Sequence, residues 1–164
     1  MVRYLYLKRS VIKPKALKIL LKYAFPCIVF WRRERNIDEK TILQIYKIAT
    51  GEEEPTPEIS QALEKLIPVA IRELESMSSG VITEDIVREY FLKRHPKVIG
   101  EDKPEWIRDL CLVKTGVINK IRGCYGEVVF EDGKRRLVRL DFIKKPKVGD
   151  KVTVHYTFAC EKIE

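Results

Sequence analysis

The C-terminal third of the chain contains the run Val152-Thr153-Val154-His155-Tyr156-Thr157-Phe158, in which apolar and polar side chains alternate. A period of two places successive side chains on opposite faces of a β-strand. A similar run spans residues 138–142, and turn signals lie at 122–123, 132–133 and 148–150. The pair Asp132-Gly133 is a strong hairpin signal. We therefore predict five short strands between Cys111 and Glu164, arranged as a small β-barrel of the OB or SH3-like kind.

The preceding part of the chain has helical patterns instead. Pro14 marks the start of a basic amphipathic helix over 15–25, which we expect Pro26 to end before a β-prone run over 27–31. Residues 2–7 alternate weakly and favour a strand. Further helices are predicted over 38–49, 57–80 with a kink at Pro68, 84–94 with an end at Pro96, and 104–110 with Trp106 packed inward. The predicted fold class is α+β: a mainly α-helical domain over 1–105, then an OB-like β-barrel over 106–164.

Charge is distributed unevenly along the 164 residues, whose net charge is +8. The basic N-terminal segment 1–36 holds ten Lys and Arg against one Glu, residues 37–110 are acidic overall, and residues 111–164 are basic again. A basic amphipathic helix either packs on the domain beside it or docks on an acidic partner, nucleic acid or membrane surface. The sequence leaves both interpretations of the segment open.

The cysteines and histidines form no recognisable zinc pattern. Cysteines stand at 27, 111, 124 and 160 without C-x-x-C spacing, and the two histidines are far apart in sequence. The sequence contains no secretory signal, and charged residues and Pro26 interrupt the longest apolar run, so we expect reduced thiols, a cytoplasmic location and no membrane span. No nucleophile–base set or glycine-rich phosphate loop appears, which predicts a non-enzymatic protein. Abundant Ile, Lys and Glu favour a thermophile source.

Three segments of the C-terminal stretch carry a family resemblance. They are Cys111-Leu112-Val113-Lys114-Thr115-Gly116, the hairpin Phe130-Glu131-Asp132-Gly133-Lys134-Arg135-Arg136-Leu137-Val138-Arg139-Leu140-Asp141, and Val148-Gly149-Asp150-Lys151-Val152-Thr153-Val154-His155-Tyr156-Thr157-Phe158-Ala159. Each is short, but together, in this order and spacing, they resemble the HypC/HupF family of hydrogenase maturation chaperones. The resemblance covers about a third of the chain, residues 111–164.

This resemblance implies an OB-like barrel that acts as a scaffold or adaptor in metallocentre assembly through protein contacts. In that family an essential cysteine supplies a thiolate to iron and a strand histidine assists. The matching positions are Cys111 and His155, which makes them candidate ligands for iron that is held transiently with a partner. The residues alone also permit Cys111 to be a small buried hydrophobic residue at a strand start and His155 to be an ordinary solvated or hydrogen-bonded histidine. The implied partners are a HypD-like maturation protein and the large subunit of a NiFe hydrogenase.

The residues alone permit another function. Lys134, Arg135, Arg136 and Arg139 form a basic hairpin, and OB-like barrels bind RNA or DNA through basic faces with stacking aromatics. A solvated hairpin is the simpler interpretation. Alternation places His155 on the outer face of its strand, and His95 is expected at a helix C-terminus as a cation that complements the helix dipole. Cys124 and Cys160 are predicted to be packing residues.

Overall fold

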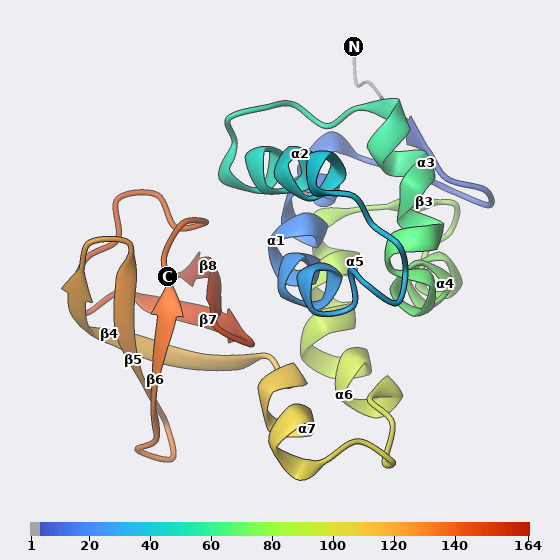
Figure 1. Cartoon of the computed structure of the whole chain (residues 1–164). Coiled ribbons are helices and arrows are strands. Elements are labelled where there is room, and N and C mark those ends of the chain that lie inside the picture. The colour runs from blue at the N-terminus through green and yellow to red at the C-terminus, as the bar shows by residue number, and fades with distance from the viewer. Residues whose placement is uncertain (1–3) are drawn as a thin grey trace. The chain divides into compact units, whose positions relative to one another are not determined.

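The structure is a computed structural model that describes residues 4–164. It combines helices, mostly in the N-terminal part, with a closed five-stranded barrel in the C-terminal part, which confirms the predicted α+β class (Figure 1). Contacts divide the chain into two compact units, one ending at Phe91 and one running from Leu92 to Glu164. The change from helical to strand periodicity had suggested a division near residue 105, and the second unit also includes the two short helices before the barrel.

The first unit is a helical bundle with a small sheet. The sheet has the order β1-β2-β3, and β1 covers part of the strand predicted over 2–7, whose residues 2 and 3 lie outside the described part. The elements are β1 (Leu5–Tyr6), β2 (Val11–Ile12), α1 (Pro14–Phe30), α2 (Glu39–Thr50), α3 (Pro57–Leu66), α4 (Pro68–Met77), β3 (Val81–Ile82) and α5 (Glu84–Glu89).

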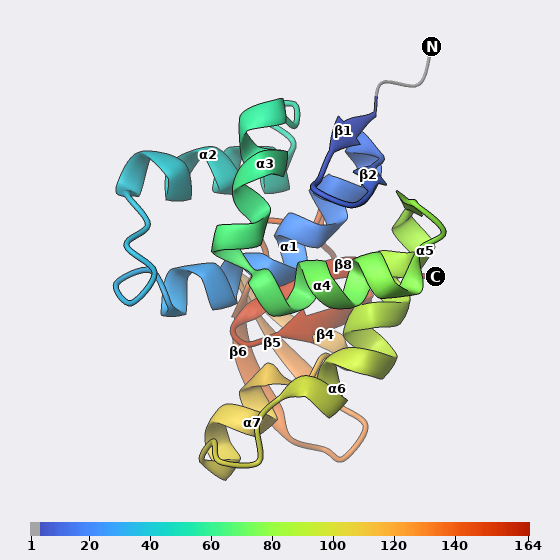
Figure 2. The same ribbon diagram turned by 90° about the vertical axis from the view of Figure 1, so that its right-hand side faces the viewer.

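Local signals set most helix ends in this unit. The Asp38 carboxylate accepts a hydrogen bond from the Thr41 amide at 2.7 Å and caps α2, and Gly51 ends that helix with φ of 85°. The predicted break at Pro68 is confirmed: α3 and α4 are separate helices, and the chain bends sharply between them (Figure 2). Proline interrupts the hydrogen-bond ladder there and begins the new helix.

The prediction that Pro26 ends the first helix is wrong, because α1 continues to Phe30. The run over 27–31 is therefore mainly helical rather than a strand. A proline inside a helix costs about 3 kcal/mol. Burial of Phe25 and Ile28 on either side of Pro26 contributes about 1.5–3 kcal/mol for each side chain, which offsets that cost.

Short helical segments lie at the boundary between the units and at the start of the second unit. A π-helical turn η1 (Tyr90–Arg94) follows α5, then come α6 (His95–Val98) and α7 (Glu105–Cys111). Pro96 does not terminate the helical segment as predicted. It lies in the first turn of α6, directly after the π-helical turn. A proline is tolerated there because the first backbone N–H groups of a helix have no partner within the helix.

The barrel confirms the five predicted strands. They are β4 (Lys114–Arg122), β5 (Tyr125–Phe130), β6 (Arg135–Arg139), β7 (Lys151–His155) and β8 (Phe158–Ile163). The closed order is β4-β5-β6-β8-β7, in which β6 and β8 are parallel and the other pairs antiparallel. Numbered from the first barrel strand, this is the order 1-2-3-5-4 of an OB-like barrel.

Alternating side chains fill the barrel. Gly116 on β4 permits close packing, because a Cβ there would lie 2.4 Å from a methyl carbon of Val128. The core residues are Ile118, Val128, Phe130, Val138, Leu140, Ile143, Val152, Val154 and Ala159. Among the described residues, none of the helices combines the length and apolar character that crossing a bilayer requires.

Candidate functional site

Cys111 is the last residue of α7 and lies against the turn between β7 and β8. Its Sγ is 2.8 Å from the hydroxyl oxygen of Tyr156, and the residue is 8% exposed. The Tyr156 amide donates a hydrogen bond to the Leu110 carbonyl at 2.9 Å. Tyr156 has φ of 53°, which is uncommon for a bulky residue. Backbone and side-chain contacts thus fix the end of α7 to one end of the barrel.

Burial keeps the Cys111 thiol protonated in this conformation. Desolvation raises its pKa, and hydrogen bonding to Tyr156 together with the positive charge of Lys103 oppose that rise only in part. The thiolate is the form that attacks electrophiles and binds metals. Cys111 therefore becomes a good ligand only when its surroundings change.

The sequence predicted that His155 faces solvent, and this prediction is wrong: the residue is fully buried. Alternation does place its side chain opposite the barrel core, but the His95 ring of α6 lies over it. The two ring centroids are 5.2 Å apart with perpendicular planes. The His155 ring also lies 5.1 Å from the ring of Tyr156, which links it to the residue that contacts Cys111.

His95 is also placed differently from the prediction. Burial lowers its pKa to about 4, and a hydrogen bond to the backbone of Cys111 opposes this only in part. A neutral imidazole cannot act as the cation that was expected at the helix end. The chain's two histidines thus meet beside Cys111 and Tyr156, and we define these four residues as the Cys111 cluster.

No local pattern predicts the contact between His95 and His155, since α7 and most of the barrel separate them in the chain. Among residues 4–164, no three His, Cys, Asp or Glu side chains are arranged so that they could hold a metal ion.

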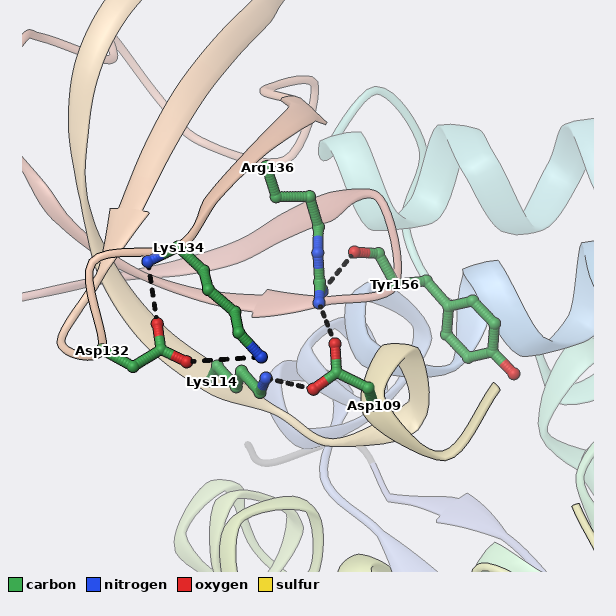
Figure 3. Close-up of polar contacts among 6 residues, drawn as sticks. All are labelled: Asp109, Lys114, Asp132, Lys134, Arg136 and Tyr156. Atoms are coloured by element: carbon green, nitrogen blue, oxygen red, sulfur yellow. Dashed lines mark hydrogen bonds and ion pairs between the residues drawn. The ribbon is translucent and has the colours of Figure 1, made fainter. Parts of the chain in front are cut away.

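An ion-pair network holds the outer side of α7 to the barrel (Figure 3). Asp109 pairs with Lys114, and its Oδ2 lies 3.2 Å from Nη2 of Arg136. Nη1 of Arg136 donates to the Tyr156 carbonyl at 2.9 Å, while the Tyr156 ring points away from the guanidinium (Figure 3). The Lys114 hydrogen bond is the main cause of the lowered pKa of Asp109, so that carboxylate stays ionised at neutral pH.

Comparison of the sequence with protein-family models and with curated proteins gives no match. The resemblance of residues 111–164 to the HypC/HupF family therefore depends on its three motifs. The geometry adds that the two motif residues Cys111 and His155 both contact Tyr156.

The four basic residues of the β5–β6 hairpin lie in different surroundings. Lys134 and Arg135 are exposed, whereas the Arg136 side chain is only 13% exposed and belongs to the Asp109 network. Arg139 makes two hydrogen bonds of 2.7 Å to the Asp141 carboxylate. Lys134 and Arg135 therefore extend toward solvent, and each makes one ion pair, with Asp132 and Glu127 respectively.

A pocket of about 290 Å³ lies beside the Asp109 network. Its rim includes Trp106, which is 61% exposed, so the prediction that this side chain packs inward is wrong. Within α7 the buried residue is Cys111, and Leu110 is half-buried at the pocket. The pocket is lined by Trp106, Asp109, Leu110, Lys114, Phe130, Lys134, Arg135 and Arg136. This surface, the α7 pocket below, combines an exposed indole with four cations and one acid.

Proposed function

We propose that this protein is a non-enzymatic adaptor in the assembly of a NiFe metallocentre and acts through protein contacts at the α7 end of its barrel. The observation that carries the proposal is the convergence of Cys111 and His155 on Tyr156. These are the two positions that the HypC/HupF resemblance assigns to iron handling. An OB-like barrel that brings them together supports that assignment.

Iron in this scheme is cargo. Cys111 supplies one thiolate after it leaves its contact with Tyr156, and a partner supplies the remaining ligands, since one cysteine and the neighbouring histidines do not complete a set. His155 lies close enough to the Tyr156 ring to respond when that contact changes. The chain itself binds the partner, positions the thiol and excludes water from it until the partner docks.

The α7 pocket supports docking of an acidic partner segment. Lys134 and Arg135 offer exposed positive charge, and Trp106 offers exposed apolar area next to it. Aromatic and Arg side chains are enriched where protein interfaces gain most of their affinity. The pocket includes residues of α7 itself, so a bound partner lies directly beside Cys111.

The test is complex formation with a HypD-like protein and with a hydrogenase large subunit from the same organism. The full chain is mixed with each, and complexes are measured by size-exclusion chromatography and by affinity titration. We expect Cys111→Ala to weaken at least one complex by tenfold or more. Cys124→Ala is the matched control, because Cys124 is an exposed cysteine in the β4–β5 turn; we expect it to bind like the unmodified protein. Absence of both complexes, or equal binding by both variants, would contradict the proposal.

A further inference from the structure

The outward faces of β4, β5 and β6 carry side chains that the Cys111 cluster does not use. Strand register aligns these side chains in rows that run across the three strands. The rows are Arg122–Tyr125–Arg139, Lys120–Glu127–Leu137 and Val117–Val129–Arg135. Each row therefore combines at least one cation with an aromatic or aliphatic side chain.

The first two rows enclose a pocket of about 230 Å³ around Tyr125. Tyr125 is 41% exposed, and the guanidinium carbon of Arg139 lies 5.3 Å from its ring centroid. Leu137, which is 63% exposed, forms another part of the wall. An accessible ring with apolar area beside it is suited to a flat ligand that stacks.

Positive charge at this pocket is available to a ligand. Lys120 and Arg122 are both exposed and form no ion pair among residues 4–164. The one acid of the pocket, Glu127, accepts a hydrogen bond from Asn119 at 2.8 Å and pairs with Arg135 at 3.4 Å. The positive charges of Lys120 and Arg122 also help to lower the pKa of Glu127, so the pocket holds two exposed cations beside one carboxylate that they share with Arg135.

Arg135 also connects this pocket to the α7 pocket. It lines the α7 pocket while its guanidinium pairs with Glu127 of the Tyr125 pocket. Each of the two pockets therefore has one exposed aromatic side chain, Trp106 or Tyr125, and at least two cations. The pair of pockets forms a continuous basic path across β5 and β6.

We propose that this path binds single-stranded nucleic acid, with bases stacked on Tyr125 and Trp106 and phosphates held by Lys120, Arg122 and Lys134. OB barrels bind oligonucleotides across their second and third strands, which are β5 and β6 here. Flexible single strands expose both bases and phosphates, which match an aromatic ring that has cations beside it. The inference goes beyond the proposed function and does not depend on it.

Binding is measured by fluorescence anisotropy with the full chain and end-labelled 12-nucleotide probes, U12 RNA and T12 DNA. The logarithm of the affinity should fall linearly with the logarithm of the salt concentration, with a slope of about −2 for three phosphate contacts. Tyr125→Ala should weaken binding roughly tenfold and Tyr125→Phe should not, because phenylalanine retains a stacking ring. Comparing U12 with T12 decides between RNA and DNA as the preferred strand.

The charge test uses a matched pair of double variants. Lys120→Gln with Arg122→Gln should reduce the salt slope by about 1.4. Lys65→Gln with Lys144→Gln removes the same charge from exposed positions outside the path and should leave the slope nearly unchanged. Lack of binding to both probes at 50 mM salt, equal slopes for the two double variants, or unchanged affinity of Tyr125→Ala would each overturn the proposal, the last in favour of a ligand held by charge alone, such as an acidic peptide. Nucleic-acid binding is measured with the chain alone, without a protein partner, so its failure is distinguishable from failure of the complexes that test the proposed function.

Discussion

Acidification should destabilise the barrel unit through His95. The pKa of His95 is lowered from 6.5 to about 4 because burial disfavours the imidazolium. In the unfolded chain His95 takes up a proton as the pH falls below 6.5, whereas in the folded chain it does so only near pH 4. The unfolded state therefore binds more protons over this window, so the stabilising contribution is complete above pH 6.5 and is lost as the pH falls toward 4.

The size of this effect follows from the two pKa values. Their difference corresponds to about 3 kcal/mol, at about 1.4 kcal/mol for each pH unit, and about 2.5 kcal/mol of it should be lost by pH 4.5. Carboxylates with lowered pKa, such as Asp109, also lose stabilising contributions in acid. The informative quantity is therefore the difference in unfolding free energy between the parent protein and His95→Gln. Both proteins contain the same carboxylates, so their titration cancels in this difference, whereas only the parent contains the His95 imidazole.

Urea unfolding of the full chain measures that difference. A Trp31→Phe background leaves Trp106 as the single tryptophan, so its fluorescence reports on the second unit. We expect His95→Gln to be less stable than the parent at pH 7 and to lose that deficit by pH 4.5. A difference that stays constant within about 0.5 kcal/mol across this range would refute the assignment of a neutral, buried imidazole to His95.

Three other predictions concern packing, thiol access and the ion-pair network. Gly116→Ala should cost about 1–3 kcal/mol, since the new Cβ would lie 2.4 Å from a side chain of β5; an unchanged urea midpoint would contradict this. A thiol reagent at pH 8 should modify exposed Cys124 well before Cys111, as followed by peptide mass spectrometry, and equal rates would count against burial of Cys111. Arg136→Met should lower the free energy of unfolding by about 1–3 kcal/mol, because it removes the donor to two acceptors, the Tyr156 carbonyl and the Asp109 carboxylate. Arg135→Met loses only an exposed ion pair and should change it by less than about 0.5 kcal/mol. Equal changes of the two variants in urea unfolding would refute this distinction.

The barrel was predictable because its signals are local. Alternation along 152–158 and the Asp132-Gly133 turn depend on near neighbours, and strand closure follows from burying one face of each strand. Pro26 failed as a helix end because burial of residues around it outweighs a local penalty. Helix and turn residues alone do not reveal which surfaces the rest of the unit will cover.

The candidate site was only partly predictable for the same reason. Cys111 and His155 came from the family motifs, but the burial of His155 depends on His95, which precedes it by most of the second unit. The alternation along β7 correctly separates two faces and still misplaces His155, because α6 covers the face that an isolated barrel would expose to water. A chain with two histidines gives no periodic pattern from which that contact could be inferred.

Exposure of Cys111 requires α7 to detach from the end of the barrel, and the contacts there set the cost. The Cys111–Tyr156 and Tyr156–Leu110 hydrogen bonds contribute about 1 kcal/mol each, and the two Asp109 ion pairs up to about 1 kcal/mol each because they are partly exposed. A total of about 3 kcal/mol leaves an open form populated at under about 1%.

A partner that needs the thiol must therefore bind the open form at least about 100-fold more tightly than the closed one. Under the proposed function, an acidic partner segment would achieve part of this preference by replacing Asp109 against Lys114 and Arg136, since those cations would remain paired when α7 leaves. Docking and thiol exposure would then be one coupled step, and Cys111 would act as a ligand only with its partner bound.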